Sequence, residues 1–225
     1  MSFILEELAR HPTYQYRVFP TSIRRQNIFI TVGLPGVGKS TFCELMRSSC
    51  PTFSCRVLSR DETRVELLWD MRKLEQHEQE ERKSKLDSLV SRSMVDKVVS
   101  VVQKGYDSVK TLIIDGCHTK MTELVSLIGT IRQAADLSFK DISITLVLVG
   151  GPDSQCRHHL SDKKAGDYSD YEFAGHHSAV PKEIFEHKRK QLKELLQPEP
   201  FKVITDMVDY VMTYPAYDPK CNCGQ

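Results

Sequence analysis

The most constraining feature of the sequence is a glycine-rich segment that directly follows a short apolar run. Residues 27–33 read NIFITVG, and from Gly33 the chain continues as GLPGVGKST. A continuous β-rich apolar run is typical of a strand buried on both faces of a parallel sheet. The residues from Lys39 to about Ser49 favour a helix. The sequence therefore predicts a strand, a tight glycine loop and a helix in immediate succession.

The chemistry of this loop follows from its spacing, Gly-x-x-x-x-Gly-Lys-Ser. Glycines let backbone N–H groups curl around a phosphate, and the start of the helix adds partial positive charge. Lys39 is expected to reach the β and γ phosphates, and Ser40 to offer its hydroxyl to Mg²⁺. A glycine-rich turn without a ligand is the alternative, but the flanking strand and helix favour ATP, or another nucleoside triphosphate, with Mg²⁺. The predicted nucleotide-binding residues are Gly33, Gly36, Val37, Gly38, Lys39, Ser40 and Thr41.

Strand and helix patterns alternate along the rest of the chain. Further strands are expected at 56–59, 109–115, 142–150 and 201–206, and further helices within 62–104, 120–135 and 181–196. The charged stretch EQHEQEERKSK is expected to break 62–104 into two helices. Their candidate buried positions are Trp69, Leu74, Leu86, Leu89, Met94, Val98 and Val102. The alternation predicts an α/β fold, a three-layer sandwich of the P-loop kinase type with a central parallel sheet of about five strands and a lid segment.

Length and composition favour a single domain over residues 1–225, with an N-terminal arm (1–26), a lid (151–180) and a C-terminal tail (207–225). Lys and Arg number 31 against 30 for Asp and Glu, so no global field indicates nucleic acid, although a local groove could still bind it. The seven cysteines are scattered, and no apolar N-terminal stretch resembles a signal peptide. We therefore expect a cytoplasmic or nuclear protein that is not secreted, with no membrane segment and no obligate protein partner.

The class of nucleotide-binding protein is narrowed by motifs that the sequence lacks. It has no Asn-Lys-x-Asp motif of the GTPases and no Leu-Ser-Gly-Gly-Gln signature of the transporters. A small kinase fits better, because the irregular segment 151–180 follows the fourth predicted strand, where a lid could close over the transferring group.

A phosphoryl acceptor would need a base, and VLSRDETRVELL offers one. Asp61 falls just after the strand 56–59, at the edge of a parallel sheet where ligand groups gather. Arg64 follows one helical turn later and could hold a neighbouring anion. The alternative is an ordinary helix start, with Asp61 as its cap. The spacing alone does not separate these two readings.

Taken together, GLPGVGKST and SRDETR resemble the polynucleotide 5′-hydroxyl kinases of the phage type, in their kinase domain only. The resemblance extends over about residues 27–196, through VPKEIFEHKRKQL. It implies that Asp61 activates the 5′-hydroxyl of RNA or DNA, that Arg64 grips the adjoining phosphate, and that Asp115 helps to orient Arg64.

Two departures from the family pattern concern the acceptor and the lid. Gly116, Cys117 and His118 stand where the family usually has a Thr or Asn, so the acceptor contact would fall to His118 or be absent. Arg157 is the candidate for the family's lid arginine. Possible substitutes are Lys163, Lys164, His176 and His177. The Asp-x-Asp-x-Thr motif is missing, so 3′-phosphatase activity is not expected.

Other interpretations stay open. Related kinases of small acceptors, such as a nucleoside, a nucleotide, an amino sugar or a seryl group on tRNA, also place an Asp after the second strand. A nucleotide-binding switch protein would need no acceptor base, so an intact Asp61 and Arg64 pair argues against it. Asp115 could instead act on magnesium through water. His158, His159, His176 and His177 lack the usual spacing of zinc ligands.

Overall fold

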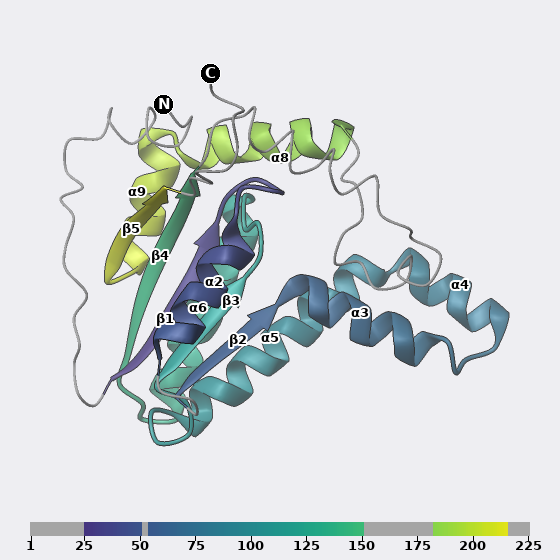
Figure 1. Ribbon diagram of the computed structural model, residues 1–225, viewed down its shortest axis with the longest axis horizontal. Helices are drawn as coiled ribbons and strands as arrows, with labels where there is room; N and C mark the ends of the chain where they lie inside the picture. Colours follow the sequence, from purple (N-terminus) through teal and green to yellow (C-terminus); the bar gives the residue numbers. More distant parts are fainter. Residues whose placement is uncertain (1–24, 51–53, 151–181, 216–225) are drawn as a thin grey trace.

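The computed structural model describes residues 25–50, 54–150 and 182–215. Within them, five strands form one parallel sheet in the order β2-β3-β1-β4-β5 (Figure 1). The strands are β1 (Gln26–Val32), β2 (Cys55–Ser59), β3 (Thr111–Asp115), β4 (Ile142–Gly150) and β5 (Tyr210–Pro215). The helices are α2 (Lys39–Ser49), α3 (Arg60–Met71), α4 (Gln76–Ser84), α5 (Leu86–Lys104), α6 (Met121–Leu137), α8 (Lys182–Leu195) and α9 (Pro198–Met207). The predicted α/β sandwich with a parallel sheet is confirmed.

The helices cover the sheet in layers. In Figure 1, α2 lies in front of the sheet and α6 lies behind it, while α8 crosses the end toward which the strands point. Neighbouring α5, α6 and α9 form the second helical layer. All nine residues of β4 are buried, as is typical of a central parallel strand covered on both faces. None of the helices that the structure describes is long and apolar enough to cross a membrane.

The region 62–104 holds three helices, not the two that were expected. The charged stretch at 75–85 was expected to separate two helices. Most of it instead forms a helix of its own, α4, in which no residue is buried. Gln, Glu, Lys and Arg are good helix formers, and the ion pair between Lys85 and Glu81 (2.8 Å) supports the end of the helix. Together, α3 and α4 project beyond the edge strand β2 (Figure 1).

This projection explains which apolar positions were predicted correctly. Met94, Val98 and Val102 on α5 are buried as expected, and Leu74, Leu86 and Leu89 are partly buried. Trp69 was expected to be buried and is 53% exposed, because the end of α3 lies beyond the sheet. The Arg72 guanidinium lies over the indole, 4.3 Å from the ring centroid, and covers part of it.

The predicted strand at 201–206 is wrong, because this segment belongs to α9. Pro198 stands in the first turn, where its missing N–H costs nothing. Phe201 and Ile204, three residues apart, are both fully buried, which is a helical spacing. The fifth strand is β5, so residues 207–225 are not simply a tail.

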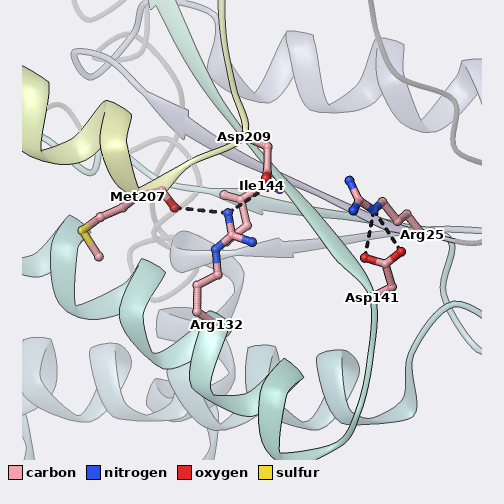
Figure 2. Close-up of polar contacts among 6 residues, drawn as sticks. All are labelled: Arg25, Arg132, Asp141, Ile144, Met207 and Asp209. Carbon is pink, nitrogen blue, oxygen red and sulfur yellow. Dashed lines mark hydrogen bonds and ion pairs between the residues drawn. The ribbon is translucent and has the colours of Figure 1, made fainter.

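Polar contacts join the N-terminal ends of β1, β4 and β5 (Figure 2). The glycine loop follows the C-terminal end of β1 and so lies at the other end of the sheet. Arg132 on α6 donates to the Met207 carbonyl (3.3 Å) and to Asp209 Oδ2 (2.8 Å). The same carboxylate accepts from the Ile144 N–H (2.8 Å), and so holds the start of β5 against β4. Arg25 and Asp141 form a second ion pair just before β1 and β4. The polar groups at this end of the sheet therefore serve to hold the strands together.

Candidate nucleotide and acceptor site

The predicted phosphate loop connects β1 to α2 at the C-terminal edge of the sheet. Gly36 (φ 76°) and Gly38 (φ 95°) adopt the left-handed conformation that glycine alone takes easily. Gly33 is needed for space, because a Cβ there would lie 2.6 Å from the Val149 carbonyl oxygen on β4. The Gly33 N–H donates to the Cys117 carbonyl (3.0 Å) and ties the loop to the end of β3.

Lys39 opens α2 and is only 8% exposed. Its Nζ donates to the Leu34 carbonyl at 2.6 Å, so the ammonium is folded over the loop. Val37 and Gly38 also lie in the loop, and Ser40 and Thr41 follow at exposed positions in the first turn of α2. The structure therefore brings together all seven residues predicted to bind the nucleotide.

Ser40 and Asp115 meet beside the loop. The Ser40 hydroxyl donates to Asp115 Oδ2 at 3.1 Å, and Thr31 Oγ1 lies 3.3 Å from Asp115 Oδ1. Asp115 is 7% exposed. Burial, and then the Asp115 charge, raise the pKa of the neighbouring Cys43 thiol, which therefore stays protonated. A hydroxyl and a carboxylate side by side fit the oxygen ligands that Mg²⁺ prefers.

Asp61 stands at the second position of α3 and is exposed. The helix cap is Ser59, whose hydroxyl accepts from the Glu62 N–H at 3.5 Å. Asp61 therefore does not cap the helix, and its carboxylate forms no hydrogen bond or ion pair with the described residues. Ser59 pairs in register with Asp115, so the start of α3 lies next to the end of β3, on the edge that carries the loop.

Arg64 points elsewhere. Its Nη2 lies 2.6 Å from Asp87 Oδ1 at the start of α5. The resemblance implied that Asp115 orients Arg64, whereas in the structure Asp115 contacts Ser40 and Thr31. Arg64 reaches Asp87 across the solvent-exposed side of α3 and α5, where the carboxylate is 76% exposed.

His118 follows β3 with φ 42°, a left-handed conformation rare outside glycine. The residue is half-buried, but its Nε2 is shut off from solvent and has no hydrogen-bond partner in the described part of the chain. Burial, and then the charges of Arg60, Lys39 and Lys188, lower the pKa of His118 to about 3. The imidazole is therefore neutral.

Three cations from separate elements thus act on His118 through their charge. Two of them, Arg60 and Lys188, were not among the site residues predicted from the sequence. Arg60 could have been suspected from its place beside Asp61, but no local pattern marks Lys188 on α8. Helix α8 reaches the site because Gln191 Oε1 accepts from the Thr119 hydroxyl (2.9 Å) and from Lys188 Nζ (3.3 Å).

A cavity of about 330 Å³ opens between α5 and α6 at this edge. Its apolar wall includes Met94, Val98, Ile114 and Leu127. Arg60, His118, Ser91, Thr122, Glu123 and Ser126 supply polar groups. The cavity could not be predicted from the sequence, because it forms only where two helices and the end of β3 meet.

The predicted lid lies outside the described residues, and with it Arg157, Lys163, Lys164, His176 and His177. The same holds for the histidines weighed as zinc ligands. Within the described residues, no cluster of three or more His, Cys, Asp or Glu side chains could hold a metal ion.

Comparisons with known proteins agree with this arrangement. The family model described as AAA domain matches residues 23–157. Kti12 of Chaetomium thermophilum, solved with ADP-AlF3, shares the fold with a TM-score of 0.51 and 13% identity over 86% of this chain and 91% of that one. A fungal RNA kinase gives a TM-score of 0.53 and 14% identity over 89% of this chain and 81% of that one.

A third structure with this fold comes from the PezAT toxin-antitoxin system of Streptococcus pneumoniae, with a TM-score of 0.55 and 10% identity over 95% of this chain and 73% of that one. No curated protein matches the sequence significantly. At these identities the solved structures show the fold, while the family model covers more than half of the chain. The protein belongs to the AAA domain family and has the fold of the P-loop nucleotide-binding proteins and kinases.

Proposed function

We propose that this protein is an ATP-dependent kinase that transfers the γ-phosphoryl group to the 5′-hydroxyl of a polynucleotide, RNA or DNA. The observation that carries the proposal is the position of Asp61. This exposed carboxylate does not cap the helix, forms no hydrogen bond or ion pair with described residues, and stands at the end of the sheet that holds the phosphate loop. A carboxylate free to accept a proton there is what an acceptor hydroxyl needs.

The proposed role of each residue follows from its position in the site. Lys39 would turn from the Leu34 carbonyl to the β and γ phosphates. Ser40 and Asp115 would hold Mg²⁺, directly or through water, and the ion would neutralise phosphate charge. Asp61 takes the proton from the hydroxyl, whose oxygen bonds to the γ phosphorus as the bond to the bridging oxygen breaks. Catalysis would rest mainly on positioning and charge.

A polyanionic acceptor is supported by the cations around His118. Arg60 and Lys188 come from α3 and α8 and act on the same imidazole as Lys39. Their charges are compatible with phosphates on both sides of the transferred group. Arg64 would also bind the acceptor, once it exchanges Asp87 for a phosphate. Arg157 remains a proposed contact to the donor, from outside the described residues.

A second candidate is a kinase of a small acceptor, such as a nucleoside or nucleotide. The observation that favours it is the cavity beside Arg60, which at about 330 Å³ has room for one nucleoside and not for a folded strand. A nucleotide-binding switch is the third possibility.

The test is phosphoryl transfer from γ-labelled ATP with Mg²⁺ to a panel of acceptors. The panel holds 5′-hydroxyl oligonucleotides of RNA and DNA, free nucleosides and mononucleotides. Label at the 5′ end of oligonucleotides is the expected result. Label on nucleosides or mononucleotides alone would favour the small-acceptor kinase. ATP hydrolysis that no acceptor accelerates would favour the switch and contradict kinase activity.

A further inference from the structure

The cavity between α5 and α6 lies beside Asp61, the proposed general base, and is not part of the phosphate loop. Ile114 and Asp115 are consecutive on β3, so their side chains point to opposite faces of the sheet. Asp115 faces Ser40, while Ile114 lines the cavity. The cavity therefore opens behind the sheet, on the face away from the α2 layer. Arg60 lines it and directly precedes Asp61 on α3.

We propose that this cavity binds the nucleobase of the first nucleoside of the acceptor strand. The inference rests on the proposed function. In a nucleoside the 5′-hydroxyl and the base are attached to one sugar. When the hydroxyl lies against Asp61, the cavity that the preceding residue Arg60 lines is a neighbouring recess for the nucleobase. Its volume, at the small end of the range for ligand pockets, suits one ring system.

The walls suit the flat faces of a base. Met94 and Val98 on α5, Ile114 on β3 and Leu127 on α6 line the cavity, and each is less than 10% exposed, so core packing holds this apolar lining in place. A methionine in such a wall adapts to rings of different shape and makes favourable contacts with them. Because every base has such a face, these walls imply affinity for any base.

The polar groups at the cavity suit the edge of a base and its phosphate. Arg60 makes no hydrogen bond or ion pair with other described residues, so its guanidinium is available to the phosphate after the first nucleoside. Glu123 lies at the surface, 3.5 Å from Lys120, and its carboxylate can accept from an exocyclic amino group. Adenine, cytosine and guanine carry such a group, whereas uracil does not. We therefore expect uracil to be the weakest first base.

The experiment compares 5′-hydroxyl strands that differ only in their first nucleotide, which carries A, C, G, U or no base. With the native protein, loss of the base should raise KM by roughly 5-fold or more, because the apolar contacts of the base are lost, with little change in kcat. Equal KM values for abasic and base-bearing strands would overturn the pocket and leave the proposed kinase intact. If no strand is labelled at all, the polynucleotide function itself fails, and the inference falls with it.

A variant locates the effect in this cavity. Ser126 is an exposed residue of α6 at the cavity, so Ser126→Phe puts a ring into the recess without disturbing a buried side chain. Ser100→Phe, at an exposed position of α5 outside the cavity, is the matched control. Ser126→Phe should raise KM for base-bearing strands and leave the abasic strand unchanged, while the control alters neither. Equal effects of Ser126→Phe on the base-bearing and the abasic strand would contradict the assignment. Unchanged ATP affinity shows that each variant is folded.

Discussion

At the scale of single residues, the site depends on which oxygen atoms face one another. The Ser40 hydroxyl donates its one proton to Asp115 Oδ2. The lone pairs of the Ser40 oxygen therefore stay available to a cation. Thr31 lies beside the second oxygen of the same carboxylate. Asp115 is thus held in place on both sides, and this favours the magnesium role over the orientation of Arg64.

Asp115→Asn tests this assignment. We expect Mg²⁺-dependent ATP binding to weaken by about 10- to 100-fold, the usual effect of losing a partner that orients a metal ligand. Binding of nucleotide without Mg²⁺ should change much less, because the phosphate loop is intact. Titration calorimetry with and without Mg²⁺ measures both. The control is Asp141→Asn at the opposite edge of the sheet. Equal weakening in both conditions would show that Asp115 only supports the loop.

The neutral state of His118 has a consequence for stability. Its pKa is lowered from 6.5 to about 3 in the folded protein, so between these values the unfolded chain binds a proton that the folded chain does not. The stabilisation is therefore complete above about pH 6.5 and is lost as the pH falls toward 3. Urea unfolding at about pH 7 and about pH 5 should show a smaller loss of stability in His118→Asn than in the native protein. An identical loss would mean that His118 titrates normally.

Gly116 is coupled to the same side chain. A Cβ on Gly116 would lie 2.7 Å from His118 Nε2, so the ring would have to move. We expect Gly116→Ala to lower the free energy of unfolding by about 1–3 kcal/mol, as overpacking does. The loss should shrink when His118 is also replaced by Ala, because the clash is then absent. Additive losses in this double-mutant cycle would show that the strain lies elsewhere.

The sequence was most informative about residues that act within one local motif. Lys39 and Ser40 could be predicted because strand, loop and helix follow one another directly. Lys188 could not, because its approach to His118 depends on how α8 is placed against the sheet. The partner of Arg64 was also beyond reach, since Asp87 stands 23 residues further along the chain.

At the scale of elements, α3 and α5 are joined on a polar side and a buried side. Lys97 on α5 pairs with Glu66 on α3, and the Thr63 hydroxyl contacts Met94 Sδ at 3.1 Å. The ion pair between Arg64 and Asp87 lies at the exposed margin of this contact. The packing of α3 on α5 therefore does not depend on that ion pair. Arg64 can exchange the Asp87 carboxylate for a phosphate of the acceptor.

This exchange predicts different effects for the two partners. Arg64→Ala should raise KM for an oligonucleotide acceptor, because the phosphate contact is lost. Asp87→Ala should leave KM unchanged or lower it, because Arg64 is released. Each change should alter stability by less than about 1 kcal/mol, as is usual for exposed pairs. Steady-state transfer kinetics with urea unfolding distinguish these effects. A higher KM in both variants would show that the ion pair itself shapes the site.

Helix α9 shows where an element could not be predicted from its residue types. FKVITD has strand-forming residues, yet the buried positions Phe201 and Ile204 repeat with a helical period. Phe201→Ala should lower the free energy of unfolding by about 3–5 kcal/mol. Val203→Ala, at a position that is 44% exposed in the same helix, is the control and should change it little. Similar losses from both changes, measured by urea unfolding, would contradict the helical packing.

At the scale of the whole molecule, the two ends of the parallel strands have different roles. Ion pairs and α9 hold the N-terminal edge, whereas the phosphate loop, Asp115, the start of α3 and α8 meet at the C-terminal edge. The order β2-β3-β1 puts β3 between the strand that leads to Asp61 and the strand that leads to the loop. This topology brings donor and acceptor groups to one edge, as is general for parallel sheets.

The most direct test of the central claim is Asp61→Asn, which keeps the size of the side chain and removes its basicity. Transfer of labelled phosphate to a 5′-hydroxyl oligonucleotide should fall by about 100- to 10,000-fold, the usual contribution of a general base. ATP affinity, measured on the same preparation, should stay within about threefold, because Asp61 belongs to α3 and not to the phosphate loop. Transfer that persists at the native rate would show that Asp61 is not the base. Loss of ATP binding together with transfer would show that its role is structural.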